Sequence, residues 1–355
     1  MESRHFSLPL LVSVIAAMLL MLAIPAEATF AGKNGRIAFV QAAGSGTDIF
    51  TMTPNGTDIK QITSFGGSGG QVCCVAWSPD GKQLVFAAKA SSSANAQLWI
   101  MEADGSNQHL LLDDPSNADI HPSFSPDDSK IAFGRCGPIN CGIFSVRVDG
   151  TGLTAITNFN HNPDVFDLWP EYSPDGKTIA FTSFNRNNGF LCAIYTVDAA
   201  GSNFRLLTPP RLTAFEPDWS PDGKKIAFSV NSNASTILDE EIWVINADGS
   251  QPVRLTNNNR HWNGYLTGPH DFSASWSPEG NKIVLERDSP DFSRSAIYLI
   301  NPDGSGQTLV FQGMRNRAAE FSPIDGGAPG QLLPKRHLKR IESGGFSPRW
   351  GPASK

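Results

Sequence analysis

The chain has 355 residues, of which 40% are hydrophobic and 17% are charged, and its formal net charge is −6. This apolar content excludes an intrinsically disordered chain, and the negative charge argues against nucleic-acid binding. The 33 Gly and 25 Pro suit a fold of short strands separated by many turns.

The N-terminal 28 residues have the features of an export signal. Arg4 supplies a positive start, an apolar run extends from Leu8 to Ile24, and Ala26-Glu27-Ala28 is a small-x-small cleavage site. We therefore expect a signal peptide at residues 1–28 and a mature, periplasmic or secreted chain at 29–355. An uncleaved anchor is the alternative, because the apolar run of 17 residues is at the short end of membrane-spanning length. No second run of this kind follows, so we expect the mature chain not to span a membrane.

A five-residue motif, aromatic-Ser-Pro-Asp-Gly, recurs with variations along the rest of the chain. The aromatic residues that open the copies are Trp77, Phe124, Tyr172, Trp219, Trp276 and Phe321. Their separations are 47, 48, 47, 57 and 45 residues. A repeat of this length is typical of β-propeller blades, each built from four short strands.

Each unit also has an internal pattern, which the copy after Trp219 illustrates. A short apolar run, Ile226-Ala227-Phe228, predicts a buried strand. A second strand alternates apolar and polar residues over Glu241–Asn246 and leads to Asp248-Gly249, a strong hairpin signal. A third strand is predicted over Val253–Thr256. We expect the repeated aromatic residues to pack between neighbouring sheets, although a ligand cage is the alternative interpretation.

The two ends of the repeat region complement each other. The first unit starts at Asn34-Gly35-Arg36-Ile37 without a preceding strand, whereas Pro348–Pro352 near the C-terminus resembles Pro217–Pro221. We therefore predict an all-β propeller of four-stranded antiparallel blades, with the ring closed by N- and C-terminal strands. Six blades are predicted, and residues 321–350 leave a degenerate seventh blade open.

On these motifs, the sequence resembles the TolB-like (WD40-like) β-propeller repeat family, over about residues 33–352. The resemblance implies a propeller fold. TolB itself is a periplasmic protein of the cell-envelope Tol system and carries an α/β domain ahead of its propeller. Only a few residues separate Ala28 from the first predicted strand, so we expect that domain to be lacking here.

The loops differ between the two ends of the predicted ring. The Ser-Pro-Asp-Gly and Asp-Gly turns, at one end, are nearly uniform, whereas the loops at the other end vary in length and composition. Such variation is where repeat proteins often place recognition, so we expect a protein or peptide partner on the variable end. Neutral drift in solvated loops is the alternative.

Several acidic and amide residues are predicted to gather at the tunnel mouth on that end. Asp119, Asp167 and Asp271 lie five residues before an aromatic residue, as does Asn316, with Glu216 and Glu320 nearby. Converging carboxylates would suit a hard cation or the basic groups of a partner, so Asp119, Asp167 and Asp271 form a candidate metal site, with Ca²⁺ as the one candidate cofactor. Alternatively, each Asp ties its own loop through an Asx-turn.

Five cysteines follow the signal, which leaves at least one without an intramolecular partner. Cys136 and Cys141 bracket a tight loop and form the candidate disulfide. Cys73 and Cys74 are adjacent and could bridge each other only with strain, so we interpret them as packed thiols. A disulfide from one of them to a cysteine of a neighbouring loop is the alternative.

Two functions are compatible with these residues. The first is a monomeric, non-catalytic propeller that binds a protein or peptide. The second is a metal-dependent hydrolase or lyase, acting on carbohydrate, in which Asp and His side chains hold a metal that activates water. The sequence favours the first, because the formal G-x-S-x-G match at residues 66–70 lacks the strand-turn-helix context of a nucleophile elbow, and no catalytic residues are predicted.

Overall fold

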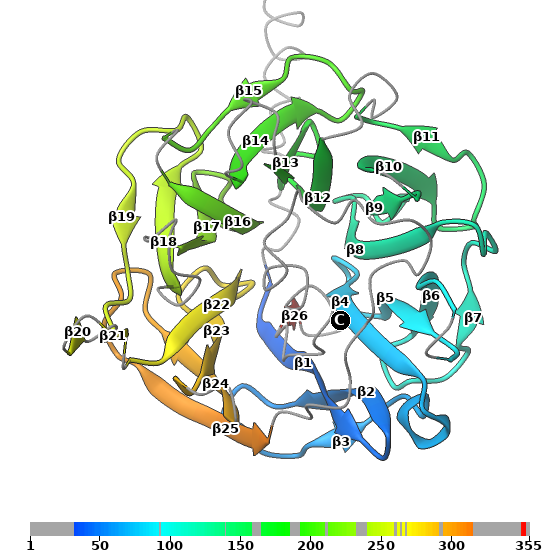
Figure 1. The fold of residues 1–355 in the computed structure, drawn as a ribbon, viewed down its shortest axis with the longest axis horizontal. Coiled ribbons are helices and arrows are strands. Elements are labelled where there is room, and N and C mark those ends of the chain that lie inside the picture. The colour runs from blue at the N-terminus through cyan, green and yellow to red at the C-terminus, as the bar shows by residue number, and fades with distance from the viewer. Residues whose placement is uncertain are drawn as a thin grey trace, which may run out of the picture.

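The structure is a computed structural model. It describes residues 32–91, 94–138, 140–157, 165–184, 192–209, 212–231, 240–258, 261–262, 265–266, 268–290, 294–314 and 349–352. In these segments the strands surround a central axis (Figure 1), and the one helical element is the short 3₁₀ turn η1 (Gly66–Ser68). The expected signal peptide lies outside the described residues.

Four sheets contain four strands each. The first is β26 (Arg349–Pro352), β1 (Asn34–Ala43), β2 (Gly46–Met52) and β3 (Lys60–Gln61). The second is β4 (Gln71–Trp77), β5 (Gln83–Lys89), β6 (Gln97–Glu102) and β7 (His109–Leu110). The third is β16 (Thr213–Trp219), β17 (Lys225–Asn231), β18 (Glu240–Asn246) and β19 (Val253–Arg254). The fourth is β22 (His270–Trp276), β23 (Ile283–Asp288), β24 (Arg294–Ile300) and β25 (Thr308–Met314).

A larger sheet of eight strands completes the ring, and β20 (His261–Trp262) pairs separately with β21 (Tyr265–Leu266). The first half of the larger sheet is β8 (Ala118–Phe124), β9 (Lys130–Cys136), β10 (Cys141–Arg147) and β11 (Thr154–Ala155). The second half is β12 (Phe166–Tyr172), β13 (Thr178–Phe184), β14 (Cys192–Asp198) and β15 (Arg205–Leu206). A parallel bridge between Cys141 and Phe166 joins the halves.

The all-β propeller of four-stranded antiparallel blades is therefore confirmed. The number of blades is not confirmed, because the ring consists of four sheets with four strands each and one sheet with eight strands. The candidate seventh blade falls mostly on residues 315–348, outside the described part of the chain.

The predicted closure of the ring is present. Strand β26 pairs antiparallel with β1, with Trp350 opposite Ile37 and Arg349 opposite Ala38. A strand from the C-terminal region thus supplies the inner strand of the N-terminal sheet, which leaves β1 paired on both sides.

The aromatic residues of the repeated motif pack in the core, as predicted. Those within the described residues are at most 7% exposed: Trp77, Phe124, Tyr172, Trp219 and Trp276. Trp77, for example, belongs to a cluster with Val40 of β1 and Ile49 of β2, in the preceding sheet. The motif therefore joins neighbouring blades through apolar burial.

The polar residues of the motif build its turn. The Ser78 hydroxyl donates to Asp80 at 2.8 Å and accepts the Gln83 N–H at 2.9 Å, while Asp80 accepts the Lys82 N–H at 3.0 Å. Gly81 has a φ of 70°, a left-handed conformation that favours glycine. Ser, Asp and Gly therefore each suit the turn itself, although Asp128 adopts the left-handed conformation at the glycine position of the Phe124 copy, with a φ of 57°.

A buried threonine after the outermost strand ties that edge to the next strand inward. Thr63, Thr157, Thr208 and Thr256 each accept, through the hydroxyl oxygen, a backbone N–H at 2.8–3.1 Å. The donors are the isoleucines Ile49, Ile143, Ile194 and Ile242. These side chains replace the backbone partner that a longer outer strand would supply.

Candidate functional site

The strands nearest the central axis in Figure 1 share a β-bulge. In β4, β8, β12, β16 and β22 the pairing register shifts just before the motif. The residue three positions before the aromatic then has a φ of 52–59°, which is uncommon for residues other than glycine. These residues are Cys74, His121, Trp169, Glu216 and Ser273. Bulges of this kind redirect side chains and often lie beside functional sites.

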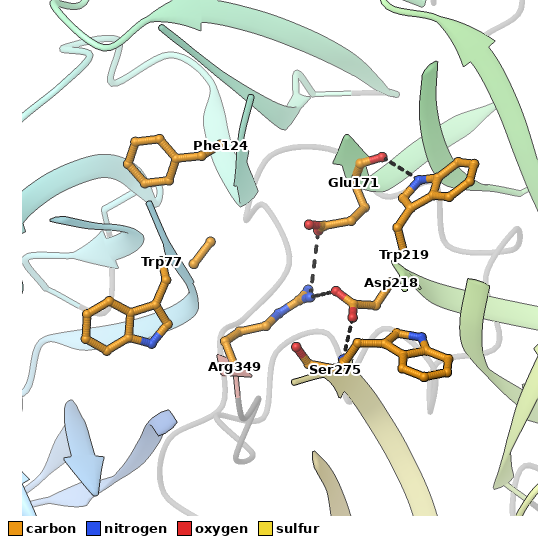
Figure 2. Close-up of a pocket in the computed structure, with 9 residues that line it drawn as sticks. Trp77, Phe124, Glu171, Asp218, Trp219, Ser275 and Arg349 are labelled. Atoms are coloured by element: carbon orange, nitrogen blue, oxygen red, sulfur yellow. Dashed lines mark hydrogen bonds and ion pairs between the residues drawn. The ribbon is translucent and has the colours of Figure 1, made fainter. Parts of the chain in front are cut away.

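A small cavity lies where the inner strands meet, and Figure 2 shows the residues around it. Its volume is about 30 Å³, more than the roughly 10–15 Å³ that one buried water molecule needs. Four of its nine lining residues are aromatic: Trp77, Phe124, Trp219 and Trp276. The polar lining comes from Glu171 of β12, Asp218 of β16, Ser275 of β22 and Arg349 of β26.

Arg349 joins two acids from neighbouring inner strands. Its Nη1 lies 2.9 Å from Asp218 Oδ1 and 3.7 Å from Glu171 Oε2. The second oxygen of Asp218 accepts the Trp276 backbone N–H at 2.7 Å. The ion pair therefore links β12, β16 and β26 across the axis, and Asp218 also reaches β22.

Burial changes the acidity of both carboxyl groups. It raises the pKa of Glu171 to about 8 and that of Asp218 to about 6, even though Arg349 opposes both shifts. Near neutral pH, Asp218 thus carries the negative charge opposite Arg349, while Glu171 holds a proton. The three groups together are close to neutral, as a poorly solvated site requires.

The aspartates predicted at the tunnel mouth have partners within their own sheets. Arg135 donates to both oxygens of Asp119 at 2.7 Å, and Arg287 donates to both oxygens of Asp271 at 2.6 and 2.8 Å. Ser183 donates to Asp167 at 2.5 Å. In each case the partner lies directly opposite on the next strand.

The sequence predicted that these aspartates either converge on a cation or bond to their own loops. The structure shows a third arrangement, in which each aspartate bonds to a residue on the next strand. Across the segments that the structure describes, no group of three or more His, Cys, Asp or Glu side chains is placed to hold a metal ion. Asp119, Asp167 and Asp271 are therefore not brought together as a metal site, and Ca²⁺ binding stays a prediction.

Three further residues were predicted at the tunnel mouth: Glu216, Asn316 and Glu320. Glu216 contacts the neighbouring sheet, because its Oε2 accepts the Ser273 N–H at 2.9 Å and the Ser273 hydroxyl at 3.0 Å. Asn316 and Glu320 lie outside the described residues.

Glu171, Asp218 and Arg349 were missed from the sequence. The sequence could have indicated them, because each is a charged residue directly before the aromatic residue of its strand. These aromatic residues are Tyr172, Trp219 and Trp350.

The cysteines are placed as follows. A disulfide joins Cys136 to Cys141 across the β9–β10 hairpin. Cys73, Cys74 and Cys192 are free thiols.

Comparison with known proteins identifies the family. The sequence family described as TolB beta propeller domain matches residues 25–208 and 161–328. The chain belongs to this family. The resemblance expected from the repeated motif is thereby confirmed.

Curated relatives match only over parts of their length. The Tol-Pal system protein TolB of Francisella tularensis subsp. mediasiatica is 31% identical over 84 residues, or 24% of this chain and 18% of that protein. The Tol-Pal system protein TolB of Nitratidesulfovibrio vulgaris is 28% identical over 148 residues, or 41% of this chain and 31% of that protein. The chain thus matches less than a third of either relative.

Solved structures agree on the fold. TolB from Acinetobacter baumannii superposes with a TM-score of 0.64 at 20% identity, covering 96% of this chain and 71% of that one. A putative TolB from Agrobacterium tumefaciens superposes with a TM-score of 0.59 at 20% identity, covering 79% of this chain and 90% of that one. Among the residues that the structure describes, no helix has the length and apolar character needed to cross a membrane.

Proposed function

We propose that the chain is an exported, non-catalytic propeller of six blades that binds a protein or peptide through its variable-loop end. The observation that carries this proposal is the ion pair where the inner strands meet. Arg349 lies 2.9 Å from Asp218 and 3.7 Å from Glu171, so these charged side chains neutralise one another instead of forming a set of catalytic groups.

The count of six treats the two halves of the eight-stranded sheet as separate blades. Each half has four strands in the order of the other sheets, and within the described residues the one strand pairing between the halves is the bridge between Cys141 and Phe166.

The loop lengths support recognition at the variable end. At one end, the connections after the inner strands span 78–82, 125–129, 173–177, 220–224 and 277–282, so they are nearly constant. At the other end, the connections between the second and third strands span 44–45, 90–96, 137–140, 185–191, 232–239 and 289–293. Loops on a rigid scaffold that differ from blade to blade can give the ring one specific surface.

The relatives indicate the kind of partner. The two curated relatives described above are named as TolB of the Tol-Pal system. This likeness supports a periplasmic chain whose partner is a protein of the cell envelope.

Site-specific photocrosslinking in the source cells tests the binding face. A benzoylphenylalanine at Ser116, exposed on the variable end, is expected to capture one defined envelope protein. The same residue at Ser129, exposed on the uniform end, is the matched control and should capture nothing. Capture from Ser129 alone, or from neither position, would contradict the proposed face.

Metal analysis tests the enzyme alternative. Because Asp119, Asp167 and Asp271 are each bonded to a partner on the next strand, the mature chain is expected to hold no stoichiometric catalytic metal. A metal present in the natural protein and lost from a variant carrying Asp119→Asn, Asp167→Asn and Asp271→Asn would instead support the metal-dependent hydrolase or lyase. The test measures the ion directly and needs no substrate.

A further inference from the structure

A thiol pair and a histidine lie together on the inner strands and have no part in the proposed function. Cys73 and Cys74 of β4 are free and partly exposed, unlike the disulfide-bonded Cys136 and Cys141. His121 of β8 occupies the same bulge position as Cys74, and both have positive φ angles, 53° and 59°. Two neighbouring blades thus present a thiol and an imidazole from equivalent, redirected positions.

His121 is held in place but is not saturated with hydrogen bonds. Its ring stacks on Trp169, the bulge residue of the next inner strand, with 4.5 Å between centroids and 30° between planes. Its Nδ1 is buried without a hydrogen-bond partner. A buried imidazole nitrogen of this kind costs free energy unless a proton or ligand satisfies it.

The surroundings of Cys74 favour a thiolate. Burial acts to raise the pKa of Cys74, but hydrogen bonds from Cys73 and His121 and the charge of His121 hold it well below its ordinary value. The pKa of Cys73 is well above its ordinary value, first because its thiol donates to Cys74. Arg349 of β26 also interacts with Cys74, and Lys89 of β5 acts on Cys73. The charged neighbours are therefore cationic, as around reactive cysteines.

We propose that Cys74 is a nucleophilic thiol, activated by His121, and a modification site that takes up a low-molecular-weight thiol as a mixed disulfide. The Cys74 proton passes to His121, and the sulfur attacks one sulfur of a small disulfide, R–S–S–R. A Cys74–S–S–R bond forms while the R–S–S–R bond breaks, and the leaving thiolate takes the proton from His121 to become RSH. The small disulfide is the oxidant, since one of its sulfurs is reduced as Cys74 is oxidised.

The third free thiol provides a contrast within the same molecule. Cys192 on β14 is buried, and that burial raises its pKa to about 12. Among the residues that the structure describes, the charges acting on it come from Glu240 and Glu216, which are anionic, unlike those around Cys74. Cys192 is thus an internal control for an inert thiol and reports whether the fold is intact.

Alkylation of the mature chain tests the reactivity. Iodoacetamide is added between pH 5.5 and 8.5, and mass spectrometry of the fragmented peptide separates Cys73 from Cys74. Below pH 7, Cys74 is expected to react at least tenfold faster than Cys73, and Cys192 should stay unmodified. His121→Gln should slow Cys74 about tenfold at pH 6.5, the effect of one pKa unit on the thiolate fraction. His109→Gln, on the exposed β7, is the matched control and should change nothing.

Glutathione disulfide tests the modification itself. One glutathionyl group is expected on Cys74 of the natural protein and none on Cys74→Ser. Equal reaction of Cys73 and Cys74, or equal rates in the two histidine variants, would overturn the role of His121. Loss of two hydrogens from the Cys73-Cys74 peptide without an adduct would overturn the mixed disulfide. Because protection of Cys192 is followed in every variant, an unfolded variant is recognised and replaced by His121→Asn.

Discussion

Arg349 lies between two buried acids, and its single charge can balance only one of them. Asp218 is the closer partner, at 2.9 Å, and Glu171 lies at 3.7 Å. The shift of the Glu171 pKa from 4.5 to about 8 means that this carboxyl group stays protonated at pH values where an unfolded chain has released the proton. Folding is therefore coupled to proton uptake at this residue.

The sign of the resulting pH dependence follows from linkage. Between about pH 4.5 and 8 the folded state binds one more proton at Glu171 than the unfolded state, so the free energy of unfolding falls as the pH rises. The slope reaches about 1.4 kcal/mol per pH unit for one proton. Asp218 acts in the same direction, up to about pH 6.

We predict that Glu171→Gln removes most of this slope between pH 6 and 8, because the amide does not titrate. Urea unfolding at a series of pH values measures it. Glu279→Gln, at an exposed position, is the control and should keep the slope of the natural protein. An unchanged slope in Glu171→Gln would show that the carboxyl group is ionised in the folded state.

The sequence located some residues correctly but not the directions of their side chains. Asp119, Asp167 and Asp271 do share one position in the repeat, as their equivalent cross-strand partners show. Regular alternation would have put them on the same face as the residue before the aromatic. The bulge inserts an extra residue between the two positions and so changes the face, which is why Glu171 and Asp218 line the cavity instead. A bulge that carries no glycine leaves no mark in the sequence.

At the scale of elements, the buried threonines explain how very short outer strands suffice. Strand β11 has only two residues, yet the N–H of Ile143 on β10 is satisfied by the Thr157 hydroxyl at 2.9 Å. The sequence predicted a strand over Val253–Thr256, whereas β19 ends at Arg254 and Thr256 accepts an N–H from β18. The buried second strand was predicted well, since its short apolar run is rich in strand-forming residues and bounded by turn signals.

We predict that Thr157→Val lowers the free energy of unfolding by about 1–3 kcal/mol, because the buried Ile143 N–H loses its acceptor while the volume is nearly conserved. Thr154→Val is the matched control, since Thr154 is exposed on β11 and its hydroxyl donates only to Gly152 at 3.0 Å. Urea unfolding of both variants measures the difference. Equal losses at the two positions would mean that the hydroxyl bond contributes little.

At the scale of the whole molecule, closure of the ring depends on one four-residue strand. Strand β26 pairs with β1 and places Arg349 between Glu171 and Asp218. The motif and its spacing were enough to predict a closed ring. The number of blades could not be fixed in the same way, because residues 321–350 depart from the repeat.

We predict that a chain ending at residue 348 has a Tm lower by about 10 °C, because it loses a buried ion pair. It should also self-associate, because β1 is left with an unpaired edge. A chain ending at residue 352 keeps β26 and serves as the control. Thermal unfolding and sedimentation velocity measure the two effects. A monomeric shorter chain with the Tm of the control would show that β26 is dispensable.

The pairing of β1 with β26 also sets the order of events during synthesis. The sheet that leaves the ribosome first is the last to be completed, because its inner strand is translated only after all the other described strands. Until β26 is made, the edge of β1 is unpaired, and unpaired strand edges make incompletely folded chains prone to aggregation. A polypeptide released early, before residue 349, cannot close the circle. Only a chain that reaches β26 therefore covers the edge of β1, and completeness of the C-terminal region is a condition for a ring without an open edge.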